Sequence, residues 1–197
     1  MLDPKEYTSL ALSTKSPNFD NDSVHVDLLH CIMGLVTESG ELEEAISKNE
    51  LDVVNVKEEF GDLLWYLAIG YTACGEDISN RLKKYTGDDL KLEISNCIIH
   101  ACQLMDICKR AFFYGKGKDA VDNDQVLYLL DEILFSIIRG LSIFEVPIEQ
   151  VMDRNIRKLY KRFKNKFSTD SAYIRNLEKE REILEGLSPE EKMLQEE

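Results

Sequence analysis

The sequence lacks any apolar run of the length that crosses a bilayer, which takes about 20 residues. Its first residues, MLDPKEYTSL, also lack the basic region and apolar stretch that mark a signal peptide. We therefore expect a cytoplasmic protein without a membrane partner.

Patterns typical of disulfides and zinc sites are missing as well. The five cysteines are an odd number, and no two of them form a Cys-x-x-Cys pair. This favours free thiols in a reducing cytoplasm. Free cysteines usually pack as small apolar side chains, so we expect packing roles for Cys31, Cys74, Cys97, Cys102 and Cys108, with Cys31 and Cys97 buried.

Positive charge is scarce. The chain has 24 lysines and arginines against 37 acidic residues, a formal net charge of −13. A general nucleic-acid-binding role is therefore not expected, because phosphate backbones require a positive surface. A small anionic substrate stays possible, since a bound divalent cation can reverse the local sign of charge.

Strand signals, meaning period-two alternation between turn clusters, are absent. Apolar residues instead recur at helical spacing, as in Leu28, Ile32, Leu35 and Leu42. We expect one all-α domain over residues 1–197, a helical bundle of about five or six helices. The helices are expected at 24–48, 55–74, 88–114, 124–139, 147–165 and within 171–186, followed by a mobile tail at 187–197.

Local signals set these boundaries. Asn55 and Glu58 resemble a capping box that would begin the second helix. Gly140 follows the expected end of the fourth helix at Arg139, and Pro147 suits the first position of the fifth.

Two acidic pairs stand out, Glu38 with Glu41 and Glu59 with Asp62. Residues three apart share a helix face, so each pair presents two carboxylates together. The pairs are also placed symmetrically about Glu50, at 12 and 9 residues on either side. If residues 24–74 form an antiparallel hairpin, all four carboxylates meet at a similar height. Such a group suits Mg²⁺, a hard cation that takes oxygen ligands and bridges to phosphates.

Gly40 and Gly61 lie inside these pairs, and glycine costs about 1 kcal/mol relative to alanine in a helix interior. Their positions suggest close approach of a backbone or ligand. Alternatively, the pairs are solvated acidic faces. A di-iron bundle would require Glu-x-x-His, which is absent.

The stretches HCIMGLVTESGELEEAI and VKEEFGDLLWYLAI closely resemble the two core helices of MazG-like, all-α nucleoside triphosphate pyrophosphohydrolases, a superfamily that also includes dimeric dUTPases. The family signature is EExxE, a spacer and ExxD. Glu38, Glu41, Glu59 and Asp62 match it, whereas Thr37 replaces the first Glu. Weaker similarity extends to about residue 185, as in longer MazG-like proteins of phages and bacteria.

The resemblance implies that these four residues bind Mg²⁺, with Mn²⁺ as a substitute, and that the protein forms a dimer or tetramer in a bacterial or phage-infected cell. Because the adjoining Glu is missing, Glu38 is the candidate general base. The expected reaction converts a nucleoside triphosphate to a monophosphate and pyrophosphate.

Several other residues are candidate substrate ligands. The resemblance implies this role for Lys109, Tyr114 and Lys116 of a KK…YGK-like segment, although cations there also favour the helix dipole. Asn155, Lys158 and Arg162 form a polar stripe that resembles the family pattern NxxKLxxR. Their alternative interpretation is a solvated basic face, within 154–175, where eight basic residues accompany one acid.

The aromatic residues near the acidic pairs are less informative about function. His30, eight residues before Glu38, could face a nucleobase, although core packing is the commoner role for such a histidine. Trp65 and Tyr66 are interpreted as core or interface side chains rather than a base-stacking platform.

Three alternatives stay open: a dUTPase-like hydrolase, a hydrolase of guanosine alarmones such as ppGpp, and a non-catalytic helical adaptor. The first two would use the same metal chemistry, so only the base pocket separates them. The adaptor would retain an acidic face without turnover.

Overall fold

The structure is a computed structural model that describes residues 12–13, 16, 19–163 and 177–186. In this part of the chain the structure has the six α-helices and two short 3₁₀ helices named below and no strand. The all-α prediction is therefore confirmed. The helices are α2 (Val26–Ile46), α3 (Val53–Ala73), α4 (Leu90–Phe113), α5 (Asn123–Ile143), α6 (Ile148–Phe163) and α8 (Leu177–Glu185). The 3₁₀ helices are η1 (Ile78–Asn80) and η2 (Gly117–Ala120).

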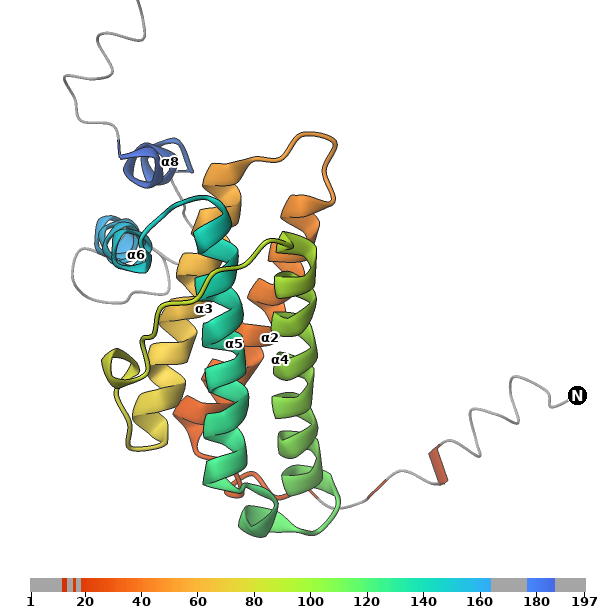
Figure 1. Cartoon of the computed structure of the whole chain (residues 1–197). Helices are drawn as coiled ribbons and strands as arrows, with labels where there is room; N and C mark the ends of the chain where they lie inside the picture. Colours follow the sequence, from red (N-terminus) through yellow and green to blue (C-terminus); the bar gives the residue numbers. More distant parts are fainter. Residues whose placement is uncertain (1–11, 14–15, 17–18, 164–176, 187–197) are drawn as a thin grey trace, which may run out of the picture.

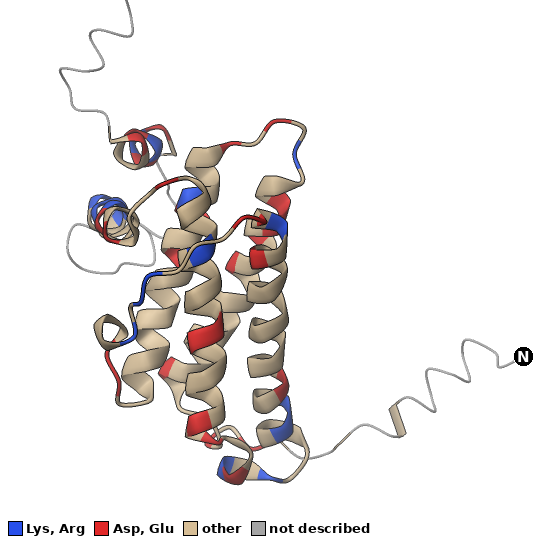
Figure 2. Cartoon of the chain, viewed as in Figure 1, with Lys and Arg blue, Asp and Glu red and all other residues tan. Residues whose placement is uncertain are grey.

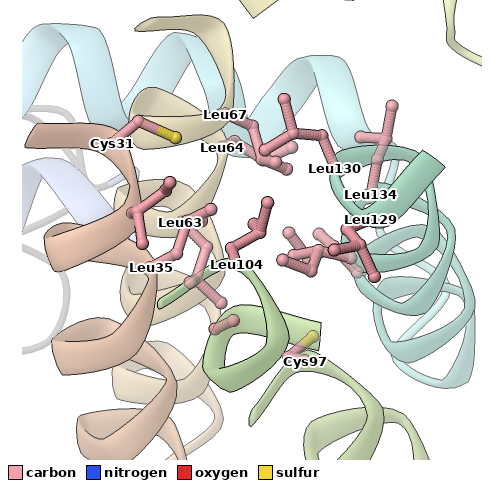
Figure 3. Packing of buried hydrophobic residues seen from close by; sticks show 14 of the residues in the cluster. Cys31, Leu35, Leu63, Leu64, Leu67, Cys97, Leu104, Leu129, Leu130 and Leu134 are labelled. Carbon is pink, nitrogen blue, oxygen red and sulfur yellow. The ribbon is translucent and has the colours of Figure 1, made fainter. Parts of the chain in front are cut away.

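Helices α2 to α5 run side by side as a bundle, and α6 and α8 lie crosswise against α3 (Figure 1). The bundle forms because each helix carries an apolar stripe with a period near 3.6 residues. Figure 3 shows these stripes meeting, with leucines and cysteines from four helices in contact. The expected stripe residues Leu28, Ile32, Leu35 and Leu42 are all buried, each contributing about 1.5–3 kcal/mol.

The α2–α3 hairpin brings the two acidic pairs together, and its second helix begins with a capping residue. Asp52 caps α3, and its carboxylate accepts from the backbone N–H groups of Val54 (3.0 Å) and Asn55 (3.2 Å). The expectation that the helix begins at Asn55 is therefore wrong by two residues, because Asp52 supplies the capping oxygen earlier in the chain.

Helix α5 shows a larger departure from its expected end. It continues past Arg139 to Ile143, so Gly140 lies inside the helix instead of ending it. A Cβ at Gly140 would lie 2.6 Å from Cζ of Phe60 on α3. This glycine is used for close helix packing rather than for chain termination.

The other boundaries differ from expectation by small amounts. Helix α6 begins at Ile148, one residue after Pro147. Part of the expected C-terminal helix is found as α8, whereas residues 164–165, 171–176 and 187–197 lie outside the described residues.

The cysteines are free thiols in the structure, as expected. Cys31, Cys97 and Cys108 are buried in the core and Cys74 is half-buried. Cys102 is exposed, so the packing role expected for all five is wrong at this position.

No helix in the described part of the chain combines the length and apolar character needed to cross a membrane.

Candidate functional site

Three of the four signature carboxylates form a cluster between α2 and α3. One oxygen each from Glu38, Glu41 and Glu59 lies within 4.8 Å of the others. Glu38 and Glu41 share a face of α2, and the hairpin brings Glu59 opposite them. Glu41 is exposed, Glu38 is half-buried and Glu59 is only 7% exposed.

Burial and mutual repulsion raise the pKa values of two members. The pKa of Glu59 is raised to about 8 by burial, then by the charges of Asp62, Glu58, Glu41 and Glu38. The pKa of Glu38 is raised to about 7 by burial and the charges of Asp62 and Glu41, against a smaller lowering by Lys158. Clustered oxygen ligands that repel one another fit a hard divalent cation, which would offset this repulsion.

Asp62 borders this cluster but is bound by α6. Asn155 Nδ2 donates to Asp62 Oδ1 at 2.6 Å, and Lys158 Nζ donates to Oδ1 at 2.8 Å and to Oδ2 at 2.6 Å. Lys158 also donates to Glu58 Oε1 at 3.1 Å. The fourth predicted metal ligand therefore has protein partners of its own, 93 and 96 residues away in the chain.

The polar stripe of α6 faces inward at two of its three positions. Asn155 is 3% exposed and Lys158 is 1% exposed, so a solvated basic face is the wrong interpretation for them. Arg162 is 15% exposed in its side chain and binds Glu180 of α8 in a bidentate pair, at 3.0 Å and 2.6 Å. Figure 2 shows basic and acidic residues side by side on α6 and α8.

The two glycines inside the acidic pairs have different environments. A Cβ on Gly61 would lie 3.1 Å from Cβ of Asn155, so this glycine lets α6 approach α3. A Cβ on Gly40 would have no atom of the described residues within 4 Å. The expected close approach is confirmed at Gly61 and is not found within the chain at Gly40.

A cavity of about 650 Å³ opens beside the carboxylates. Its lining comes from α2, α3, α6 and α8 and includes all four signature acids, Asn55, Glu58, His30, Trp65, Tyr66 and Arg162. His30 is exposed, so core packing is the wrong interpretation for it. Trp65 and Tyr66 are half-buried and line the cavity. Tyr66 also packs against the hydrophobic core, as expected, whereas an interface role for Trp65 stays a prediction.

The residues at and just beyond the C-terminal end of α4 are not brought to this cavity within one chain. Lys109 forms an ion pair with Asp106 and lies 5.9 Å from the ring centroid of Tyr114. Tyr114 and Lys116 are exposed, and none of the three residues lines the cavity. A substrate role for Lys109, Tyr114 and Lys116 at this site would require a second copy of the chain.

Two residues at the site were missed by sequence reasoning. Glu58 shares Lys158 with Asp62, and Glu180 holds Arg162. Glu58 stands next to Glu59 in the sequence, and this position could have indicated that it belongs to the site. Glu180 lies in a charged helix without a distinguishing neighbour, so only the fold reveals its partner.

Comparison with known proteins finds a match for the α2–α3 part of this site. Residues 27–86 match the family model of the MazG nucleotide pyrophosphohydrolase domain. This segment of the chain is MazG-like. This match spans α2, α3 and all four signature acids, and it indicates a nucleotide pyrophosphohydrolase. MazG-like domains generally depend on a divalent metal, and the acidic cluster supplies a candidate position for one. Searches of curated proteins and of solved structures find no match.

Proposed function

We propose that this MazG-like chain hydrolyses a nucleoside triphosphate to a nucleoside monophosphate and pyrophosphate with Mg²⁺, for which Mn²⁺ can substitute. The observation that carries the proposal is the cluster of Glu38, Glu41 and Glu59 beside a cavity large enough for a nucleotide. These three carboxylates would hold the cation, and Asp62 borders them. Bound there, the metal would supply positive charge that offsets the charge of the carboxylates and the triphosphate.

Glu38 is the proposed general base. Its carboxylate is half-buried and lines the cavity, where it could accept a proton from a bound water. In the proposed step, a water oxygen bonds to the α-phosphorus while its proton passes to Glu38. The bond from the α-phosphorus to the bridging oxygen breaks, and pyrophosphate leaves with that electron pair.

Lys158 and Asn155 are proposed to position Asp62 rather than to reach the substrate directly. Both are almost fully buried, and both contact the Asp62 carboxylate. They would fix this carboxylate at the border of the cluster and limit the negative charge that accumulates there.

Arg162 is proposed as the positively charged residue of the same chain that binds the triphosphate. It lines the cavity, but its guanidinium is bound to Glu180. On substrate binding, a phosphate group would therefore replace the Glu180 carboxylate as the bidentate partner of the guanidinium. Lys109, Tyr114 and Lys116 would contribute from a partner copy in a homodimer or homotetramer.

The test is a panel of ribo- and deoxynucleoside triphosphates, dUTP and guanosine alarmones, each incubated with the protein and Mg²⁺. Identification of a monophosphate and pyrophosphate supports the proposal, whereas a diphosphate and orthophosphate contradict it. A strong preference for dUTP or for an alarmone would select the corresponding alternative. Absence of turnover on the whole panel would favour the non-catalytic adaptor.

A further inference from the structure

Arg162 is the one lysine or arginine that the described residues contribute to the cavity lining, and it is already paired. Five acidic residues line the same cavity. The Arg162 guanidinium donates to Glu180 twice, at 3.0 Å from Nε and at 2.6 Å from Nη2. The two side chains are 15% and 5% exposed. The cationic group that an anionic ligand could reach in this cavity is therefore occupied by an acid of the same chain.

Glu180 belongs to α8, which arginine side chains attach to α3 and α6. Arg181 follows Glu180 and donates to both carboxylate oxygens of Asp52, at 2.6 Å and 3.2 Å. Asp52 caps α3, and Figure 1 shows α8 beside α6 near this end of α3. Arg154 of α6 donates to the Leu184 carbonyl at 2.7 Å. These contacts fix α8 against both helices, and this docking brings Glu180 to Arg162.

The attachment of α8 through Arg181 is open to solvent. The side chains of Arg181 and Asp52 are 51% and 34% exposed, and ion pairs of this kind contribute little to stability. Isolated helices shorter than about 12 residues are marginal in water, and α8 has nine, so α8 relies on its docking contacts. Of the two ion pairs, that of Arg162 and Glu180 is the better buried. An anion that takes over Arg162 would therefore compete directly with the docking of α8.

We infer that α8 is an autoinhibitory latch: in its docked position Glu180 occupies Arg162 and lowers the affinity of the cavity for phosphate groups. The guanidinium holds one bidentate anion at a time, so phosphate and Glu180 compete for it. Contacts that dock α8, such as that of Arg181 with Asp52, therefore weaken phosphate binding although neither residue lines the cavity. This inference rests on the proposed function, because it concerns regulation of the cavity in which that function places the triphosphate. The alternative is a permanent ion pair in which Glu180 only holds Arg162 in place.

Inorganic tripolyphosphate with Mg²⁺ is the probe, and calorimetry of the full chain measures its affinity. Glu180→Gln should tighten binding about tenfold or more, because the guanidinium loses its charged partner and can hold phosphate instead. Glu178→Gln makes the same change at an exposed residue of α8 and should leave the affinity unchanged. In a double-mutant cycle, Glu180→Gln should bring no gain once Arg162→Gln has removed the guanidinium. Unchanged or weaker binding in Glu180→Gln would overturn the latch, as would absence of binding in both this variant and the wild type.

Arg181→Gln tests the latch from outside the cavity, at an exposed residue whose replacement leaves Glu180 and Arg162 in place. It should tighten tripolyphosphate binding about two- to fivefold, because the loss of an exposed ion pair only partly undocks α8. Removal of a positive charge would by itself weaken the binding of an anion, so a gain in affinity identifies release of α8. Arg110→Gln is the matched control, since it breaks a partly exposed ion pair within α4 and should bring no gain. Equal affinities in Arg181→Gln and Arg110→Gln would overturn the latch.

These titrations do not depend on turnover, so the latch and the proposed hydrolysis can fail separately. If Glu180→Gln and Arg181→Gln tighten tripolyphosphate binding but no nucleotide yields pyrophosphate, the latch stands and the proposed hydrolysis fails. If pyrophosphate is released while both variants bind tripolyphosphate as the wild type does, hydrolysis stands and the latch fails.

Discussion

Lys158 is 1% exposed, and its ammonium group is placed between the carboxylates of Asp62 and Glu58. Removing one partner of a buried ion pair is costly because the remaining charge keeps its desolvation without compensation. Lys158 therefore stabilises the contact between α3 and α6, in addition to any influence on the site.

Lys158→Ala should lower the free energy of unfolding by about 3 kcal/mol or more, measured by urea denaturation. Lys161→Ala, at an exposed lysine on the same helix, should change it by less than about 0.5 kcal/mol. Unchanged stability of Lys158→Ala together with a raised KM for a triphosphate would instead show that this side chain reaches the substrate.

Glu59 and Glu38 make stability depend on pH when no divalent cation is bound. Their folded-state pKa values, about 8 and about 7, lie above the ordinary value of 4.5, so folding favours their protonated forms. Their contribution is therefore fully present below pH 4.5 and is lost as the pH rises through about 7 and about 8.

Glu59→Gln should match the wild type in stability at about pH 4.5 and exceed it at about pH 8.5, because the amide cannot ionise. The measurement is urea denaturation at both pH values with a chelator present. The difference between variant and wild type isolates this group from the other acids. A difference that is the same at both pH values would contradict the raised pKa.

At the scale of the helix, Gly40 and Gly61 provide a matched comparison. Gly40→Ala should raise the free energy of unfolding by about 1 kcal/mol, since alanine favours the helix and no described atom lies near its Cβ. Gly61→Ala should lower it by about 1–3 kcal/mol, because the new Cβ presses on Asn155. Both are measured by denaturation without metal. Effects of the same sign would contradict the close packing of α6 on Gly61.

The helices and the acidic cluster could be predicted from the sequence because both are determined by residues that lie close together in the chain. The apolar period defines α2 and α3, and the symmetry about Glu50 brings Glu38, Glu41 and Glu59 together once the hairpin forms. Helix ends were less predictable. Asp52 and Asn55 are both acceptable caps, and Gly140 serves helix packing although glycine often ends helices.

The partners of the site residues could not be predicted in the same way. Asp62 meets Lys158, and Arg162 meets Glu180, only because α6 crosses α3 and α8 packs on α6. Such pairs depend on helix crossing and rotation, which periodicity does not specify. The position of Trp65 and Tyr66 in the cavity lining could not be predicted for the same reason, since an aromatic pair on a helix fits a core as well as a cavity wall.

At the scale of the whole molecule, apolar side chains are exposed on the outer faces of α2 and α4. Val26 and Met33 are 70% and 53% exposed, and Leu92 and Ile99 are 53% and 51% exposed. Each pair is seven residues apart and so lies on one helix face. These exposed apolar side chains on two neighbouring helices are candidate contacts for the proposed homo-oligomer.

Light scattering should give a mass of two or four times the 22.7 kDa of one chain. Met33→Glu combined with Ile99→Glu should reduce this mass, because charge at these apolar positions opposes their burial in an interface. Exposed Lys48→Glu is the control. A monomer at micromolar concentration would contradict the oligomer and would leave Lys109, Tyr114 and Lys116 without a route to the cavity.

We propose that the cluster of Glu38, Glu41 and Glu59 holds the metal on which hydrolysis depends. The most direct measurement is the initial rate of pyrophosphate release from a nucleoside triphosphate against Mg²⁺ concentration. Glu41→Gln and Glu59→Gln should each lower the rate about 100-fold or more, whereas Glu44→Gln, at an exposed acid on the same helix as Glu41, should keep the wild-type curve. Near-normal rates in both cluster variants at limiting Mg²⁺ would contradict the claim.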